Sequence, residues 1–101
     1  MTAVRHLVLL RFKAEAPAAE VTRLENLFAA LPQKIPGIIA FDWGTEDGSE
    51  DLARGFTHAF NFTFESVAAR DAYLPHPAHQ DFVSQLQLQL ADVLVLDYPL
   101  P

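Results

Sequence analysis

The stretch Phe56-Thr-His-Ala-Phe-Asn-Phe-Thr-Phe64 decides the fold, because large aromatic side chains alternate in it with small or polar ones. A period of two is typical of a β-strand whose two faces have different neighbours. The first predicted face carries Phe56, His58, Phe60, Phe62 and Phe64. The second carries Thr57, Ala59, Asn61 and Thr63, which are small enough to let another sheet approach closely. We therefore expect helices to cover the aromatic face.

The preceding residues predict two further strands and a helix. Val4–Phe12 is aliphatic on both faces, which indicates a strand with neighbours above and below. From Pro17 to Leu31 the apolar side chains recur at spacings of three and four, which predicts an amphipathic helix. Pro32 and the pair Pro36-Gly37 are expected to end that helix. Ile38–Trp43 is predicted to be the next strand.

The residues after Phe64 predict two helices and a last strand. Ser66 is suited to cap a short helix that ends near Tyr73. Gln85–Leu90 alternates like a strand, yet a helical stripe runs through the same region. We favour a helix from Pro77 to about Leu90, followed by a strand over Val93–Tyr98. The stripe consists of His79, Phe82, Val83, Leu86 and Leu90.

These elements follow one another in the order β-α-β-β-α-α-β. That order is typical of a ferredoxin-like α+β fold, in which helices cover one side of a four-stranded sheet. The 101 residues suffice for one domain with its own core, and we assign residues 1–101 to it.

The composition excludes several classes of function. The net charge is −6 and the seven Lys and Arg residues are scattered, which argues against nucleic-acid binding. Without cysteine, the chain has no disulfide and no thiolate nucleophile or metal ligand. The apolar run Leu7–Leu10 is too short to span a membrane, so we expect a cytoplasmic protein without a membrane partner. The acidic residues 46–51 are interpreted as a solvated loop.

The sheet face away from the helices is also predicted to be apolar. Leu7 and Leu9 lie on it, and we expect Ile39, Phe41 and Trp43 to join them. Isolated domains seldom expose a contiguous apolar patch on the order of several hundred Å². The sequence therefore predicts a homodimer in which two sheets pack face to face.

Five short motifs follow one another along the chain. They are His6-Leu-Val-Leu-Leu-Arg-Phe-Lys13, Ile35-Pro-Gly-Ile38, Gly55-Phe-Thr-His58, Phe64-Glu-Ser66 and Tyr73-Leu-Pro-His-Pro-Ala-His79. In combination and in this order they resemble the stress-responsive A/B barrel family, whose members are also called Dabb domains. The resemblance covers nearly the whole chain. It implies a ferredoxin-like subunit and a dimeric α+β barrel.

One plant member of that family closes a linear polyketide by an intramolecular aldol reaction, without a metal or an organic cofactor. The resemblance to it implies a general base at His79, a hydrogen-bonding tyrosine at Tyr73, and cavity-lining histidines at His6 and His58. Phe28 departs from the pattern, because that cyclase has a tyrosine near its pocket. No cofactor is implied for this chain.

The periodicity itself predicts that His79 faces the sheet, on the same stripe as the apolar residues of its helix. His6 and His58 lie on corresponding faces of neighbouring strands, so three imidazoles are expected to converge beneath the helices. Burial favours the neutral imidazole, which accepts a proton at pH 7 and as a general base contributes about 10²–10⁴-fold in rate. The alternative is that these histidines are ordinary hydrogen-bonded core residues.

His76 and His79, with Asp81 nearby, have the residue types of a metal site. We do not expect one, because Pro77 separates His76 from the helix that carries His79. His76 is expected to cap that helix or to face solvent.

Three hypotheses of function remain open. The first is a homodimeric protein that binds a small apolar or carbonyl-containing ligand, and the second is a cofactor-independent cyclase or lyase. The third is an assembly subunit whose histidines only satisfy core polarity. A pocket of about 300 Å³ or more, lined by His6, His58, Tyr73 and His79, favours the first two, and a filled core favours the third.

Overall fold

Residues 2–101, which the computed structural model describes, fold into one sheet of four strands and three helices. In chain order the elements are β1 (Val4–Phe12), α1 (Ala18–Lys34), β2 (Ile38–Thr45), β3 (His58–Phe64), α2 (Val67–Tyr73), α3 (Pro77–Leu86) and β4 (Leu90–Pro99). This order confirms the predicted ferredoxin-like α+β class.

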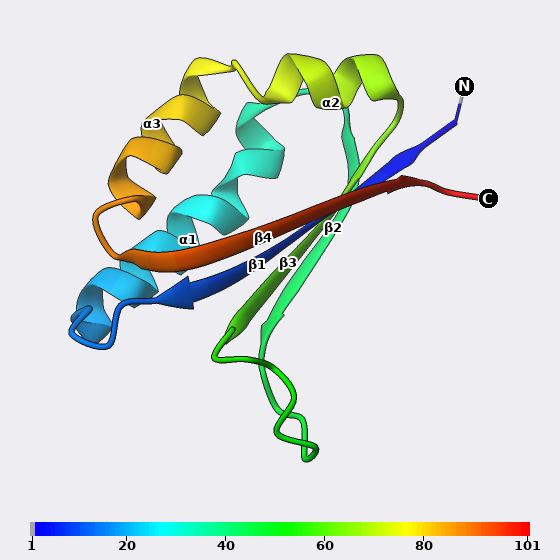
Figure 1. The fold of residues 1–101 in the computed structure, drawn as a ribbon. Coiled ribbons are helices and arrows are strands. Elements are labelled where there is room, and N and C mark those ends of the chain that lie inside the picture. The colour runs from blue at the N-terminus through cyan, green and yellow to red at the C-terminus, as the bar shows by residue number, and fades with distance from the viewer. Residues whose placement is uncertain (1) are drawn as a thin grey trace.

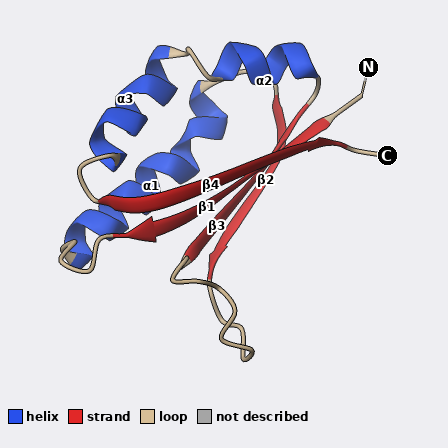
Figure 2. Cartoon of the chain, in the orientation of Figure 1, coloured by secondary structure: helices blue, strands red, loops and turns tan. Residues whose placement is uncertain are grey.

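The sheet is antiparallel, with the strands in the order β2-β3-β1-β4. β1 pairs with β3 on one side and β4 on the other. In the described part of the chain, the three helices lie over one face of the sheet and leave the other face uncovered (Figures 1 and 2). The loop between β2 and β3 extends away from the helices (Figure 1).

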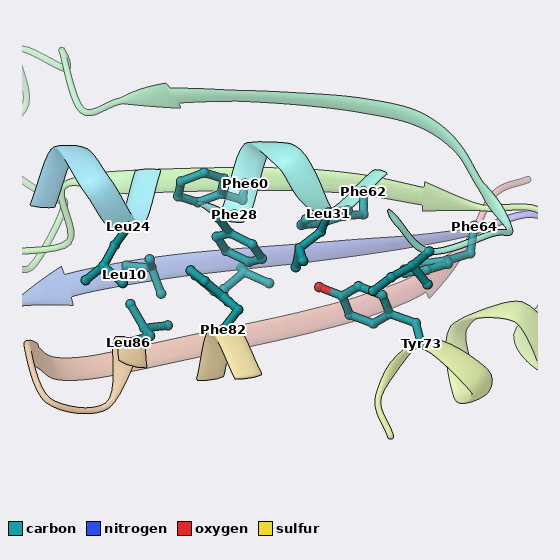
Figure 3. Close-up of a cluster of buried hydrophobic side chains, with 12 residues drawn as sticks. Leu10, Leu24, Phe28, Leu31, Phe60, Phe62, Phe64, Tyr73, Phe82 and Leu86 are labelled. Atoms are coloured by element: carbon teal, nitrogen blue, oxygen red, sulfur yellow. The ribbon is translucent and has the colours of Figure 1, made fainter. Parts of the chain in front are cut away.

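The core lies between the helices and the aromatic face of β3 (Figure 3). Phe28 of α1 packs against Phe60, with 4.3 Å between ring centroids, and against Phe82 of α3, with 4.4 Å. Such offset aromatic contacts add about 0.5–1.5 kcal/mol each beyond the area they bury. The fully buried side chains include Tyr73, Phe60, Phe62, Phe64, Leu10, Leu24 and Leu31.

β3 begins two residues later than predicted, at His58. The N–H of Phe56 donates to the carbonyl of Ala53, which closes a turn that contains Gly55 at φ 83°. Phe56 therefore belongs to the loop, and its assignment to the aromatic face of the strand was wrong. Because its N–H is already used in this turn, Phe56 does not pair with a neighbouring strand.

α1 continues through Pro32 to Lys34, although proline was expected to end it. A proline inside a helix removes one backbone hydrogen bond at a cost of about 3 kcal/mol. The helix continues because Leu31 and Ile35 on either side are buried against the sheet, and the N–H of Ile35 still donates to the Leu31 carbonyl.

α3 is shorter than predicted and β4 longer. The helix ends at Leu86, and β4 starts at Leu90, opposite Phe12 of β1. Between them, the carbonyls of Leu88 and Gln89 accept from Lys13, through its Nζ and backbone N–H respectively. The strand-like alternation of Gln85–Leu90 is not realised either, because residues 87–89 form a turn and only Leu90 pairs with β1.

The predicted outer patch has a different composition from the observed one. A register shift between Ile38 and Ala40 brings Phe41 opposite Phe62, and both rings pack on the helix side, as does Trp43 against Phe60. The expectation that Phe41 and Trp43 lie on the outer face was wrong, because the bulge reverses the alternation. β4 supplies the missing apolar residues, since Leu94 and Leu96 lie opposite Leu9 and Leu7.

Among the helices of residues 2–101, none is long and apolar enough to cross a membrane.

Candidate functional site

A cavity of about 660 Å³ lies beneath α2 and α3, on the helix side of β1 and β4. Its polar lining residues are His6, Arg70, Asp71, Tyr73, His79, Gln87 and Asp97. Its apolar lining residues are Val8, Phe28, Leu74, Phe82, Val83, Leu86, Leu90, Val93 and Val95. Val93 and Val95 of the edge strand are exposed, so the cavity is accessible from the β4 side.

His79 reaches this cavity from the first turn of α3. Pro77 starts the helix, and the Nδ1 atom of His76 accepts the N–H of Ala78, which confirms the capping role expected for His76. The Nδ1 of His79 lies 2.9 Å from the carbonyl oxygen of Leu74. A carbonyl only accepts, so Nδ1 carries the proton and the Nε2 of the neutral ring is free to accept one. Burial lowers the pKa of His79, and the Leu74 hydrogen bond opposes that effect in part.

Tyr73 stands beside His79, with 4.3 Å between the ring centroids. It is the last residue of α2 and is fully buried. Its hydroxyl has no hydrogen-bond partner within residues 2–101 and points toward the space between Phe28, Leu31 and Phe82 (Figure 3). Burial raises the pKa of the Tyr73 phenol. The hydroxyl therefore stays protonated at neutral pH and is available as a donor.

His6 lines the same cavity from β1 and is joined through Asp97 to Arg70, two residues that the sequence did not single out. The His6 Nδ1 lies 2.7 Å from Oδ1 of Asp97, and Oδ2 of Asp97 lies 2.6 Å from Nη1 of Arg70. Arg70 also donates to Asp71 through Nε, at 2.8 Å. Hydrogen bonds to Asp71 and Asp97 raise the pKa of Arg70. The only sequence signal for this group was the charged Asp97, which is the one charged residue of the predicted strand Val93–Tyr98.

His58 is not part of the cavity lining. It lies opposite Leu10 of β1, whereas His6 lies opposite Phe62, so the two histidines are four positions apart along the sheet. Its Nε2 lies 2.6 Å from Oε2 of Glu25, and its Nδ1 lies 2.7 Å from the hydroxyl oxygen of Thr57. The prediction that three imidazoles converge is therefore wrong for His58. Alternation identified its face of the sheet but not its place along the strand.

The described residues hold no cluster of three or more His, Asp or Glu side chains suited to a metal ion. What the cavity does combine is the imidazoles of His6 and His79, a phenol that stays protonated, and apolar walls. This arrangement is able to remove a proton from carbon or oxygen and to polarise a carbonyl group.

A family model, "Stress responsive A/B Barrel Domain", matches residues 4–100. Among curated proteins, the chain is 32% identical over 96 residues to the olivetolic acid cyclase of Cannabis sativa. The aligned region covers 95% of each chain.

Two solved structures are similar in shape. The hydroxynitrile lyase of Passiflora edulis superposes with a TM-score of 0.91 at 30% identity, over 98% of this chain and 94% of that one. A dimeric ferredoxin-like protein of unknown function from Jannaschia sp. CCS1 superposes with a TM-score of 0.83 at 26% identity, over 97% and 99%.

Proposed function

Since the chain belongs to the stress-responsive A/B barrel family, we propose that it is a homodimer in which each subunit binds a small carbonyl-containing ligand with an apolar part. The observation that carries the proposal is the cavity of about 660 Å³ lined by His6, Tyr73 and His79. Ligand pockets typically have volumes of about 300–1,000 Å³ and combine apolar walls with a few convergent polar groups. An assembly subunit needs no such space.

The distribution of side chains supports this class of ligand. The polar groups Tyr73, His79 and His6 come from α2, α3 and β1, so they surround one part of the cavity. Phe82, Leu86 and Val95 supply apolar surface beside them. A carbonyl group finds a donor at Tyr73, and an alkyl or aryl group is removed from water along the apolar wall.

The uncovered sheet face supports the homodimer. Leu94 and Leu96 on this face are 44% and 54% exposed, next to Leu7 and Leu9. The similar protein from Jannaschia sp. is described as dimeric. The cytoplasmic location expected from the sequence belongs to this proposal, and cell fractionation tests it.

A cofactor-independent cyclase or lyase is the second candidate function, favoured by the neutral imidazole of His79 beside Tyr73. The Nε2 of His79 removes a proton from a carbon between two carbonyls, and Tyr73 donates to the oxygen that gains charge. The freed electron pair forms a bond to another carbonyl carbon of the same molecule, and that oxygen receives the proton from His79. Atoms and charges balance without a co-reactant. The relatives named olivetolic acid cyclase and hydroxynitrile lyase support this candidate.

Calorimetric titration with a linear alkyl β-triketone tests ligand binding. We expect one site per subunit in the wild type and about tenfold or more weaker binding in His79→Ala, because a buried hydrogen bond is lost. His76→Asn is the matched control, since asparagine also caps a helix and His76 does not line the cavity. The proposal fails if the wild type does not bind, or if His79→Ala binds equally well.

Product analysis by mass spectrometry separates catalysis from binding. Cyclised triketone, or benzaldehyde released from mandelonitrile, is expected with the wild type and absent with His79→Ala. Binding without turnover of either probe supports the first function over the second.

A further inference from the structure

Asp97 joins His6 to Arg70 at one end of the cavity. The β1–β4 register aligns His6 with Asp97, so the sheet itself brings the imidazole and the carboxylate together. Each oxygen of Asp97 has its own partner, with Oδ1 at 2.7 Å from His6 Nδ1 and Oδ2 at 2.6 Å from Arg70 Nη1. Arg70 comes from α2, so the contact also ties this short helix to the edge strand.

The donors and acceptors fix the proton of His6. A guanidinium only donates and an ionised carboxylate only accepts, so His6 must present an N–H to Asp97 through Nδ1. In the neutral ring, Nε2 then carries a lone pair and no hydrogen. His6 is buried and lines the cavity, and within residues 2–101 its ring bonds to Asp97 alone.

The same contacts determine which charge the cavity accepts. Arg70 is held by two carboxylates, those of Asp71 and Asp97, so its positive charge is already matched. Arg70, Asp71 and Asp97 together place one cation and two anions at this end of the cavity. An anionic head group gains no free cation here and meets an excess of negative charge.

We propose that Asp97 and Arg70 are positioning residues that hold His6 as a hydrogen-bond acceptor, so that the cavity selects a neutral head group carrying a hydroxyl. Tyr73 donates to one oxygen of this head group, and the Nε2 atoms of His6 and His79 accept from its hydroxyl or its acidic C–H. An enolised β-dicarbonyl or an α-hydroxy compound has this pattern, and a carboxylate does not. This selection rests on the proposed ligand-binding function, and the assignment of the His6 proton does not.

Two-bond nitrogen–proton correlation spectra of ¹⁵N-labelled protein test the positioning role without any ligand. His6 of the wild type is expected to carry its proton on Nδ1, and Arg70→Lys is expected to preserve that state. In Asp97→Asn the side-chain amide is able to donate to Nδ1, so the proton is expected to move to Nε2. Amide spectra of each variant establish that it is folded. A wild-type proton on Nε2, or an unchanged tautomer in a folded Asp97→Asn, overturns the assignment.

Calorimetry with an enolised β-diketone and a carboxylate of matched size tests the selection. The wild type is expected to bind the β-diketone about tenfold or more tightly than the carboxylate, and Asp97→Asn to lose most of that preference. Equal binding of both probes, or a preference for the carboxylate, overturns the selection. If the tautomers are as assigned and neither probe binds, the proposed ligand class is wrong, while the positioning of His6 by Asp97 is upheld.

Discussion

His79 and Tyr73 show how one residue pair acquires its chemical character from its surroundings. The Leu74 carbonyl fixes the proton of His79, and burial favours its neutral form. Tyr73 keeps its proton because the phenolate is disfavoured in the same environment. An acceptor and a donor therefore stand side by side at neutral pH, although neither residue carries a charge.

The lowered pKa of His79 predicts a pH dependence of stability. Above the ordinary histidine pKa of about 6.5, folded and unfolded chains both hold the ring neutral, so His79 contributes nothing. As the pH falls below that value, the unfolded chain binds the proton first, and the free energy of unfolding decreases until the folded pKa is passed. Urea titrations at several pH values should show this decrease in the wild type and a smaller one in His79→Gln. Identical pH profiles would contradict the assignment.

Tyr73→Phe separates the hydroxyl of Tyr73 from its ring. The ring contacts with Phe62, Phe64 and His79 remain, and a buried hydroxyl without a partner is removed. We expect the free energy of unfolding to stay the same or rise by about 1 kcal/mol, and probe binding to weaken about tenfold. Urea denaturation and calorimetry measure the two effects. Lower stability together with unchanged binding would argue against a donor role.

The sequence predicted part of this site. The helical period placed His79 toward the sheet, and the family resemblance identified Tyr73 and His6. Arg70 and Asp97 were missed, because a pair that is 27 residues apart becomes visible only when strand register is known. His58 was assigned to the cavity because alternation reveals the face of a strand and not the distance along it.

At the level of elements, the turn between α1 and β2 depends on one glycine. Gly37 has φ +95°, and a Cβ added there would lie 2.7 Å from the Cβ of Ala69 in α2. The close approach lets α2 pack against this turn, and the Glu65 N–H donates to the Gly37 carbonyl from the end of β3. The position therefore couples α1, α2 and the sheet.

Gly37→Ala is expected to lower the free energy of unfolding by about 1–3 kcal/mol, through the left-handed backbone and the clash with Ala69. Gly44→Ala on β2 is the matched control, since a Cβ there meets no atom within 4 Å and its φ is not left-handed. We expect the control to stay within about 0.5 kcal/mol of the wild type or to be more stable. Urea denaturation measures the free energy of unfolding of both variants. Equal losses of stability in the two would refute the account of Gly37.

Element order was predictable because periods of two and of three to four residues alternate clearly along the chain. Element ends were less predictable where tertiary contacts compete with propensity. Pro32 does not end α1, because burial on both sides maintains the helix, whereas α3 ends at Leu86, where a turn leads into β4. The bulge in β2 gave no signal in the sequence, and it moved Phe41 and Trp43 to the other face.

At the level of the whole molecule, the helices protect one sheet face and leave the other apolar. Leu96 lies on that outer face in the edge strand β4, opposite Leu7 and half exposed, so a face-to-face dimer buries it. The cavity is on the helix side, which leaves it accessible in such a dimer.

Leu96→Glu is therefore expected to produce a monomer, because a buried unpaired carboxylate is strongly disfavoured at an apolar interface. Leu88→Glu makes the same change at a side chain that is 69% exposed in the turn before β4, and we expect that variant to stay dimeric. Sedimentation velocity at micromolar concentration measures both. A monomeric wild type, or a dimeric and folded Leu96→Glu, would contradict sheet-to-sheet packing.

The central claim is that the cavity beneath α2 and α3 binds a carbonyl-containing ligand. A crystal structure of the protein grown with an enolised β-diketone tests it most directly. The account predicts density for the probe between Tyr73 and His79, with one probe oxygen within hydrogen-bond distance of the tyrosine hydroxyl and another near His6 or His79 Nε2. A cavity closed by side chains, or a probe bound only elsewhere on the molecule, would contradict it.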